Sequence, residues 1–234
     1  ILTLAGMYNL ALAETQATGE EIQKRQINES LYVLNDHANA YFQKNMHETE
    51  IGKTLALSYF KERGFSEDTI QKFELGYCLD MYDELYKTLK RDGFKEEYIE
   101  QLGLSKKYDK GWRDFFKGRI MFPIHNLTGK VVGFAGRVLG SAEKTAKYIN
   151  SPENEIYHKS KILYGLHLAK RAIPKDNYCL LVEGYTDVIS LYQAGVENVV
   201  ASSGTALTPD QLKLIRRFTE NLYLLYDGDK AGMN

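Results

Sequence analysis

The spacing of apolar residues predicts a helical first half of the chain. From about residue 27 to about 105, apolar residues recur every three or four positions, which is the period of a helix packed on one side. The first predicted helix places five residues on one face: Leu31, Leu34, Ala38, Tyr41 and Phe42. Two helix-turn units follow, with turns at Gly64-Phe65 and Gly93-Phe94, and each restarts on acidic residues that favour a helix N-terminus.

The pattern changes near Lys106 to short apolar runs. The runs "RIMFPI" (119–124) and "KVVGFAGRV" (130–138) are joined by "HNLTG" (125–129). Two apolar runs separated by a short polar segment that contains glycine are typical of a β-hairpin. A basic and polar stretch from Ser141 to Ile173 leads out of this hairpin.

The last part of the chain alternates strand and helix patterns. Strands are predicted within 178–185, 198–202 and 221–229, with helices at 186–195 and 208–218 between them. Thr208 and Gln211 form the pattern of a capping box at the start of the second helix. Strands and helices in strict alternation with short loops predict a parallel α/β unit, in which ligands bind at the carboxyl ends of the strands.

Composition restricts the class of protein. The chain has 234 residues, of which 44% are hydrophobic, and its 30 basic and 31 acidic residues give a net charge of -1. An anionic partner must therefore bind through local clusters of positive charge. Two distant cysteines do not indicate a disulfide framework or a zinc site, and we expect a reducing cytoplasm and no membrane span. Residues 1–26 predict a connector, because "ETQATGEEIQKRQ" (14–26) is polar and has no sustained apolar face, and the absence of an initial methionine suggests a piece of a longer protein.

Three acidic residues follow strands of the predicted α/β unit. Glu183 comes directly after the first strand, and Asp227 and Asp229 follow the apolar run of the third. If the strands share one sheet, the three carboxylates converge, and Mg²⁺ is the natural cation for such a group of oxygen ligands. Taken alone, "DGD" is also typical of a polar turn. Its likeness to a calcium loop is poor, because Ala231 occupies the fifth position.

Two long segments resemble known families. "LLVEGYTDVISLYQAG" with "LLYDGDKAG" resembles the Toprim module, in which a glutamate ends the first strand and Asp-x-Asp ends the third. "FKGRIMFPIHNLTGKVVGFAGRVLG" with "KYINSPENEIYHKSKILYGL" is similar to the core of bacterial DnaG-type primases. The resemblance implies an α+β fold, with a helical and β-rich subdomain (27–175) followed by a partial Toprim unit with parallel strands (176–234).

The resemblance also implies a nucleotidyltransferase that makes RNA primers on single-stranded DNA, with Mg²⁺ or Mn²⁺ as cofactor. Glu183, Asp227 and Asp229 match the catalytic and metal-binding acids, and Asp187 would support them or simply favour its helix N-terminus. Six residues match nucleotide-contacting or basic motifs: Arg119, Arg137, Lys147, Tyr148, Asn150 and Lys159. Any of these cations could instead be a solvated surface charge, but Arg137 lies in an apolar run, where an unpaired charge is costly.

The partners expected from the resemblance are single-stranded DNA, ribonucleoside triphosphates and a replicative helicase of the primosome. In this family zinc belongs to a preceding domain and the helicase contact to a following one, so we expect neither in this chain and little primer synthesis by this chain alone. The location would be the bacterial cytoplasm, at the nucleoid and replisome. Two alternatives remain at this point: another Toprim protein of the nuclease or topoisomerase type, or a non-catalytic nucleic-acid-binding module.

Overall fold

The computed structural model describes residues 18–140, 146–202, 204 and 206–226. The first element is helix α2 (Gly19–Glu48), which begins within the segment 1–26 that we expected to be a connector. Thr18 accepts a hydrogen bond from the Glu21 amide at 3.2 Å, and the Glu21 carboxylate accepts one from the Thr18 amide at 2.9 Å. This capping box starts the helix at residues that have no apolar face. The last part of the expected connector is therefore helical.

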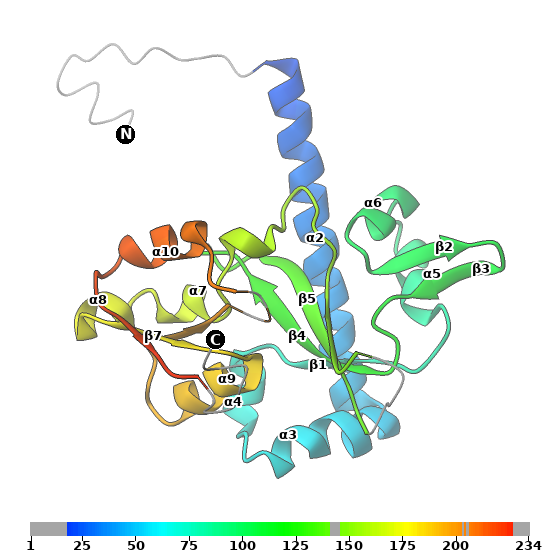
Figure 1. Ribbon diagram of the computed structural model, residues 1–234. Helices are drawn as coiled ribbons and strands as arrows, with labels where there is room; N and C mark the ends of the chain where they lie inside the picture. Colours follow the sequence, from blue (N-terminus) through cyan, green and yellow to red (C-terminus); the bar gives the residue numbers. More distant parts are fainter. Residues whose placement is uncertain (1–17, 141–145, 203, 205, 227–234) are drawn as a thin grey trace, which may run out of the picture.

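The apolar face of α2 packs on a four-stranded sheet, whose order is β1 (Gly76–Cys78), β4 (Arg119–His125), β5 (Val131–Val138) and β6 (Tyr148–Asn150). Leu31, Leu34, Ala38 and Phe42 are fully buried, as their spacing predicts. The Phe42 ring meets the Phe134 ring edge-on at 5.2 Å between centroids. Figure 1 shows α2 running beside the sheet and extending beyond it.

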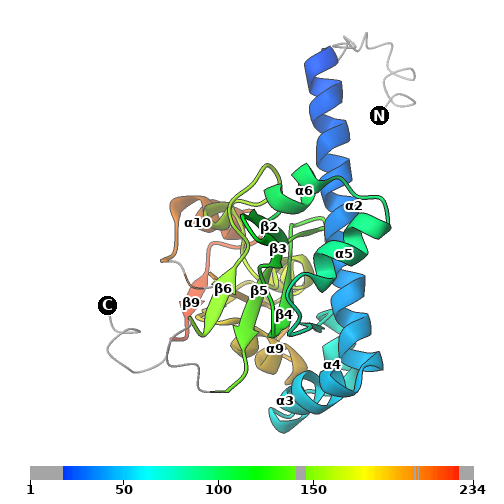
Figure 2. The same ribbon diagram turned by 90° about the vertical axis from the view of Figure 1, so that its right-hand side faces the viewer.

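Strands β4 (Arg119–His125) and β5 (Val131–Val138) form the predicted antiparallel hairpin, with Phe122 opposite Ala135. Every residue of β4 is buried because both faces of the sheet are covered. Met121 packs with α2, whereas Ile120 and Phe122 pack with the C-terminal unit on the other face. Figure 2 shows the sheet between these two layers. Burial on both faces explains why these strands read as continuous apolar runs.

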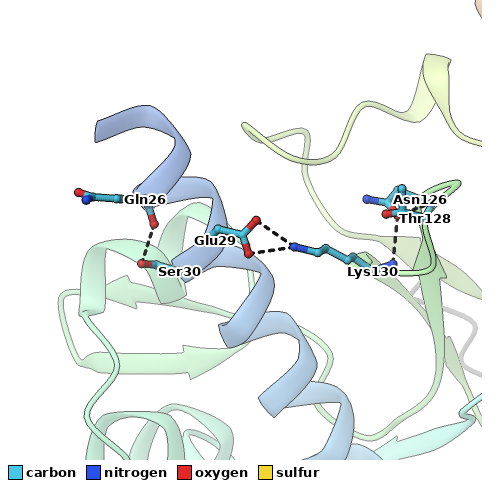
Figure 3. A network of polar contacts seen from close by, with 6 residues as sticks. All are labelled: Gln26, Glu29, Ser30, Asn126, Thr128 and Lys130. Atoms are coloured by element: carbon cyan, nitrogen blue, oxygen red, sulfur yellow. Dashed lines mark hydrogen bonds and ion pairs between the residues drawn. The ribbon is translucent and has the colours of Figure 1, made fainter. Parts of the chain in front are cut away.

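The turn of this hairpin is closed by Asn126, whose side-chain oxygen accepts hydrogen bonds from the amides of Thr128 and Lys130. The Lys130 ammonium then reaches both carboxylate oxygens of Glu29 on α2, at 2.9 Å each. Figure 3 shows this contact and the Asn126 network beside it. Both side chains are largely exposed, so the ion pair orients the turn and adds at most about 1 kcal/mol.

The sheet also contains two short outer strands. Strand β6 (Tyr148–Asn150) pairs with β5, and β1 (Gly76–Cys78) pairs with β4 inside a region that we expected to be helical. Three residues are too few to show a period, so pairing with β4 decides the conformation of β1. Gly76 is required there, because a Cβ would lie 2.7 Å from the Phe42 carbonyl carbon.

The predicted helix-turn units are present. Helices α3 (Ser58–Glu62) and α4 (Glu67–Lys72) flank the first Gly-Phe turn, and α5 (Glu84–Arg91) and α6 (Glu96–Gln101) flank the second. Gly64 and Gly93 have φ of 79° and 92°, the left-handed region that ends helices. A π-helical segment (Gly52–Leu57) joins α2 to α3, and a two-stranded hairpin, β2 (Ser105–Tyr108) and β3 (Gly111–Asp114), follows α6.

The C-terminal unit has the predicted strand-helix alternation. Its elements are β7 (Cys179–Val182), α9 (Tyr185–Gln193), β8 (Val199–Ala201), α10 (Pro209–Arg216) and β9 (Leu222–Leu224). The sheet order is β8-β7-β9, and both pairings are parallel. Three short helical segments connect it to β6: η2 (Lys159–Lys161), α7 (Leu166–Ala169) and α8 (Ala172–Asp176).

A pair of histidines lies where α7 meets the end of β4. The rings of His125 and His167 are 4.2 Å apart, and His125 Nε2 lies 3.3 Å from a Glu74 carboxylate oxygen. Burial, with the nearby charge of His125, lowers the pKa of His167 to about 3. This joint therefore contains a histidine that the fold holds in its neutral form.

This lowered pKa predicts a loss of stability in acid. Below pH 6.5 the unfolded chain binds a proton at His167, whereas the folded chain does so only near pH 3. As the pH drops from 6.5 towards 3, the free energy of unfolding should therefore decrease, and this group contributes up to about 1.4 kcal/mol per pH unit. Urea unfolding of His167→Phe at pH 7.5, 6.5, 5.5 and 4.5 should show a shallower decline than the wild type. The exposed His47→Gln variant is the control, and equal slopes for all three proteins would contradict the prediction.

Candidate nucleotide and metal site

Arg137 lies near the end of β5, directly opposite Tyr148 of β6. Its guanidinium carbon lies 4.6 Å from the centre of the Tyr59 ring and 5.7 Å from that of Tyr148. Nε and Nη1 of Arg137 are buried, and no acceptor within the part of the chain that the structure describes receives a hydrogen bond from them. Arg137 as a whole is partly buried, but buried donors without acceptors are costly, and an anionic ligand would supply the acceptors.

A second guanidinium group lies over the Tyr59 ring. Arg63, at the end of α3, lies 4.9 Å from the centre of the same Tyr59 ring. We refer to Arg63, Arg137, Tyr59 and Tyr148 as the arginine–tyrosine cluster. No local pattern indicates Arg63 or Tyr59, because their approach to β5 depends on how α3 packs.

Tyr148 connects the arginine–tyrosine cluster to the C-terminal unit. Its ring centroid lies 6.2 Å from that of Phe122 and 5.9 Å from that of Tyr185, the first residue of α9. The Tyr185 hydroxyl donates a hydrogen bond of 2.8 Å to the Asn150 side-chain oxygen. Burial raises the pKa of Tyr148, so its hydroxyl stays protonated at neutral pH. Tyr148 and Asn150, both predicted site residues, thus line the seam between the sheet and α9.

Glu183 lies at the same seam, in the short link between β7 and α9, and is partly buried. Asp187 accepts a hydrogen bond of 3.0 Å from the Gly184 amide and caps α9. This is the ordinary helix-terminal role that the sequence offered as one reading of Asp187. A further role in supporting the site stays a prediction.

Asp227 and Asp229 lie outside the described residues, so their distance from Glu183 is not defined. The chain leading to them does approach Glu183. Strands β7 and β9 are parallel neighbours, and the Leu225 amide donates to the Leu181 carbonyl at 2.9 Å. Burial and the charge of Glu183 raise the pKa of Tyr226, the residue before Asp227. Among the described residues no group of three His, Cys, Asp or Glu side chains could hold a metal, and the acidic triad stays a prediction.

Arg119 has a different environment from Arg137, although both lie on the same hairpin. Its side chain is buried, and Nη1 donates to the carbonyls of Gly136, Ala146 and Lys147 at 3.2, 3.0 and 3.4 Å. Burial lowers the pKa of Arg119. Gly136 allows the arginine to approach, because a Cβ there would lie 3.0 Å from Arg119 Cδ. Arg119 therefore joins β4 to β5 and to the start of β6, and its predicted contact with a nucleotide stays untested.

The two predicted lysines lie on different segments. Lys147 is exposed just before β6, and its carbonyl accepts from the Val138 amide at 3.0 Å. Lys159 is partly buried on η2. Within residues 18–140, 146–202, 204 and 206–226, neither ammonium forms an ion pair with an acidic residue.

Comparison with known families decides the relationship. Residues 41–170 match the family described as "DNA primase catalytic core, N-terminal domain", and residues 180–234 match a family described as "Toprim-like". The chain belongs to the DnaG-type DNA primase family. DNA primase from Escherichia coli strain K12 is 37% identical over 230 residues, which are 98% of this chain and 39% of that relative. The chain thus spans about two fifths of the length of this primase.

Solved primase structures share the fold. The Aquifex aeolicus primase structure, which contains zinc-binding and RNA polymerase domains, has a TM-score of 0.80 and 35% identity, and the match covers 99% of this chain and 54% of that one. A DnaG primase catalytic domain bound to single-stranded DNA has a TM-score of 0.78 and 39% identity, over 89% of this chain and 66% of that one. The mixed helix and strand fold with a parallel C-terminal sheet is therefore confirmed as the primase-core fold.

We predict that the same substitution has a larger effect on stability at Arg119 than at Arg137. Arg119→Met should lower the free energy of unfolding by about 1–3 kcal/mol, because three backbone carbonyls lose their donor. Arg137→Met should change it by less than about 1 kcal/mol, because the lost ring contacts are offset by removing two buried donors that have no acceptor in the described part of the chain. Urea denaturation of both variants checks this. An equal loss in both would show that Arg137 is also structural.

Proposed function

We propose that this chain is the catalytic-core part of a bacterial replicative DNA primase, which synthesises short RNA primers on single-stranded DNA. The observation that carries the proposal is the arginine–tyrosine cluster, where two buried nitrogens of Arg137 lie beside the Tyr148 ring and find no acceptor among the described residues. A nucleotide supplies both partners, a phosphate for the guanidinium and a base or sugar for the ring. Family membership supports the class of reaction, and the cluster supports this position for the nucleotide.

The metal site of this proposal consists of Glu183, Asp227 and Asp229. Parallel pairing of β7 with β9 supports it, because their carboxyl ends meet at one edge of the sheet. The influence of Glu183 on the pKa of Tyr226 is consistent with that convergence. Carboxylates at one edge suit Mg²⁺ or Mn²⁺. When bound, such ions would stabilise charge on the reacting phosphate and on the departing pyrophosphate.

The remaining predicted residues would hold the nucleotides. Lys147 and Lys159 would bind phosphates, since their ammonium groups have no acidic partner within the described residues. Arg119 and Asn150 would support the nucleotide site indirectly, because their hydrogen bonds hold the segment that carries Tyr148 in place. The 3′-hydroxyl of one nucleotide would attack the α-phosphorus of the next, and pyrophosphate would leave. Glu183 would hold a metal or accept the hydroxyl proton, and Asp187 would keep α9 in place behind it.

The partners that we propose are single-stranded DNA, ribonucleoside triphosphates and, for the whole protein, a replicative helicase. The DNA-bound structure of a similar catalytic domain supports the first of these. Among the described residues, no helix has the length and apolar character needed to cross a bilayer. We place the protein at the bacterial replisome, and zinc in a separate domain of the whole primase, as in the Aquifex aeolicus structure.

Nucleotide binding should depend on Arg137. In the full-length protein, Arg137→Met should raise the Kd for ribonucleoside triphosphates by about 10–100-fold, because a charge-assisted hydrogen bond is lost. Fluorescence titration with a labelled nucleotide measures this. Arg216→Met is the matched control, since Arg216 is exposed on α10 and paired with Glu220. Unchanged nucleotide affinity in Arg137→Met would contradict the proposal.

Metal binding should depend on Glu183. Glu183→Gln in the full-length protein should weaken Mn²⁺ binding about tenfold or more and abolish primer synthesis, because an amide is a poorer ligand for a hard cation. Electron paramagnetic resonance of free Mn²⁺ gives the affinity. The exposed Glu197→Gln variant, which removes an acid from the same unit, should bind Mn²⁺ normally. Equal Mn²⁺ affinity in Glu183→Gln and wild type would remove Glu183 from the metal site.

A further inference from the structure

The side chain of Gln211 connects the C-terminal unit to the segment that carries Lys159. Gln211 lies in the first turn of α10 and is fully buried. Its Nε2 donates to the Lys159 carbonyl at 3.1 Å and to the Ile162 carbonyl at 2.8 Å. Its Oε1 accepts from the Thr208 amide at 3.0 Å. The amide nitrogen and oxygen of this buried side chain are both used, and the nitrogen reaches Lys159 of η2 and Ile162, the residue after η2.

Other contacts hold the same segment from both sides. The Thr208 hydroxyl donates to the Ser160 carbonyl at 2.6 Å, and the Lys159 amide donates to a Glu153 carboxylate oxygen at 2.8 Å. Further on, Tyr164 and Ala201 exchange backbone hydrogen bonds of 2.9 and 3.1 Å. The backbone of Lys159 is thus fixed at both its amide and its carbonyl.

The capping box at Thr208 does not require glutamine. It needs only an acceptor at position 211, and glutamate supplies one equally well. The donors of Gln211 satisfy the carbonyls of Lys159 and Ile162, and a glutamate would instead place a carboxylate against these two oxygens. The choice of an amide therefore reflects the contact with η2.

We propose that Gln211 is a positioning residue for Lys159. The first turn of α10, in the Toprim-like unit, sets where the Lys159 ammonium lies, so nucleotide affinity depends on an amide that touches no nucleotide. This inference rests on the proposed function, in which Lys159 binds a triphosphate. It adds a contact through which the Toprim-like unit controls a phosphate-binding residue of the preceding subdomain.

Steady-state primer synthesis by the full-length protein tests this with Gln211→Glu, which keeps the cap and the side-chain size. We expect KM for ribonucleoside triphosphates to rise about tenfold with kcat nearly unchanged, because a displaced ammonium loses its phosphate contact. In a Lys159→Ala background the same substitution should raise KM no further, since the residue that it positions is gone.

The matched control is Asn198→Asp. Asn198 is also a buried amide of the C-terminal unit, and it donates to the Tyr178 carbonyl at 3.0 Å, with no contact to η2 among its hydrogen bonds. This variant should lower Tm as much as Gln211→Glu while leaving KM unchanged. Amide hydrogen exchange should accelerate at residues 159–162 in Gln211→Glu only.

The outcomes separate the two proposals. If Lys159→Ala leaves KM unchanged, the proposed contact between Lys159 and the triphosphate fails. If Lys159→Ala raises KM but Gln211→Glu raises it equally with and without Lys159, or Asn198→Asp has the same effect, the positioning role is overturned. Unchanged hydrogen exchange at residues 159–162 in Gln211→Glu would also overturn it.

Discussion

Strand β5 forms hydrogen bonds along both of its edges, to β4 and to β6, and the site depends on the register of these two pairings. Arg137 lies opposite Ile120 on one side and Tyr148 on the other. A shift of one residue would turn Arg137 to the other face of the sheet. Such a shift is strongly disfavoured, because α2 covers one face of β4 and β5 and the C-terminal unit covers the other. Apolar packing on two sides therefore fixes the position of a polar group.

Local chemistry explains which elements the sequence predicted. The hairpin turn, the Gly-Phe helix ends and the cap of α10 each depend on neighbouring residues, and their patterns were sufficient. Strand β1 and the approach of Arg63 to Tyr59 depend on contacts between distant segments, which leave no local pattern. Arg119 and Arg137 illustrate the same limit. Both lie in apolar β-runs, yet they point to opposite faces of the sheet. Arg119 lies on the face of Met121, whereas Arg137 is paired with Ile120 and therefore lies on the face of Phe122, because side chains alternate along a strand.

The two units of the chain share a core at the seam where the candidate site lies. Phe122 of β4 stacks on Tyr185 of α9 at 5.5 Å, and both belong to a buried cluster that contains Val182 and Ala201. The residues proposed to bind phosphate and those proposed to bind metal come from opposite sides of this seam. Their relative positions are therefore set by tight apolar packing, which transmits small displacements.

Helix α2 has a consequence for the reach of the chain. Its residues from Gly19 to Arg25 are exposed, and the first fully buried position is Leu31. At 1.5 Å per residue, the helix carries Gly19 about 18 Å along its axis from Leu31. A capped helix is a stiff spacer with a defined length and direction. Thr18 is therefore held at a set distance and in a set direction from the sheet.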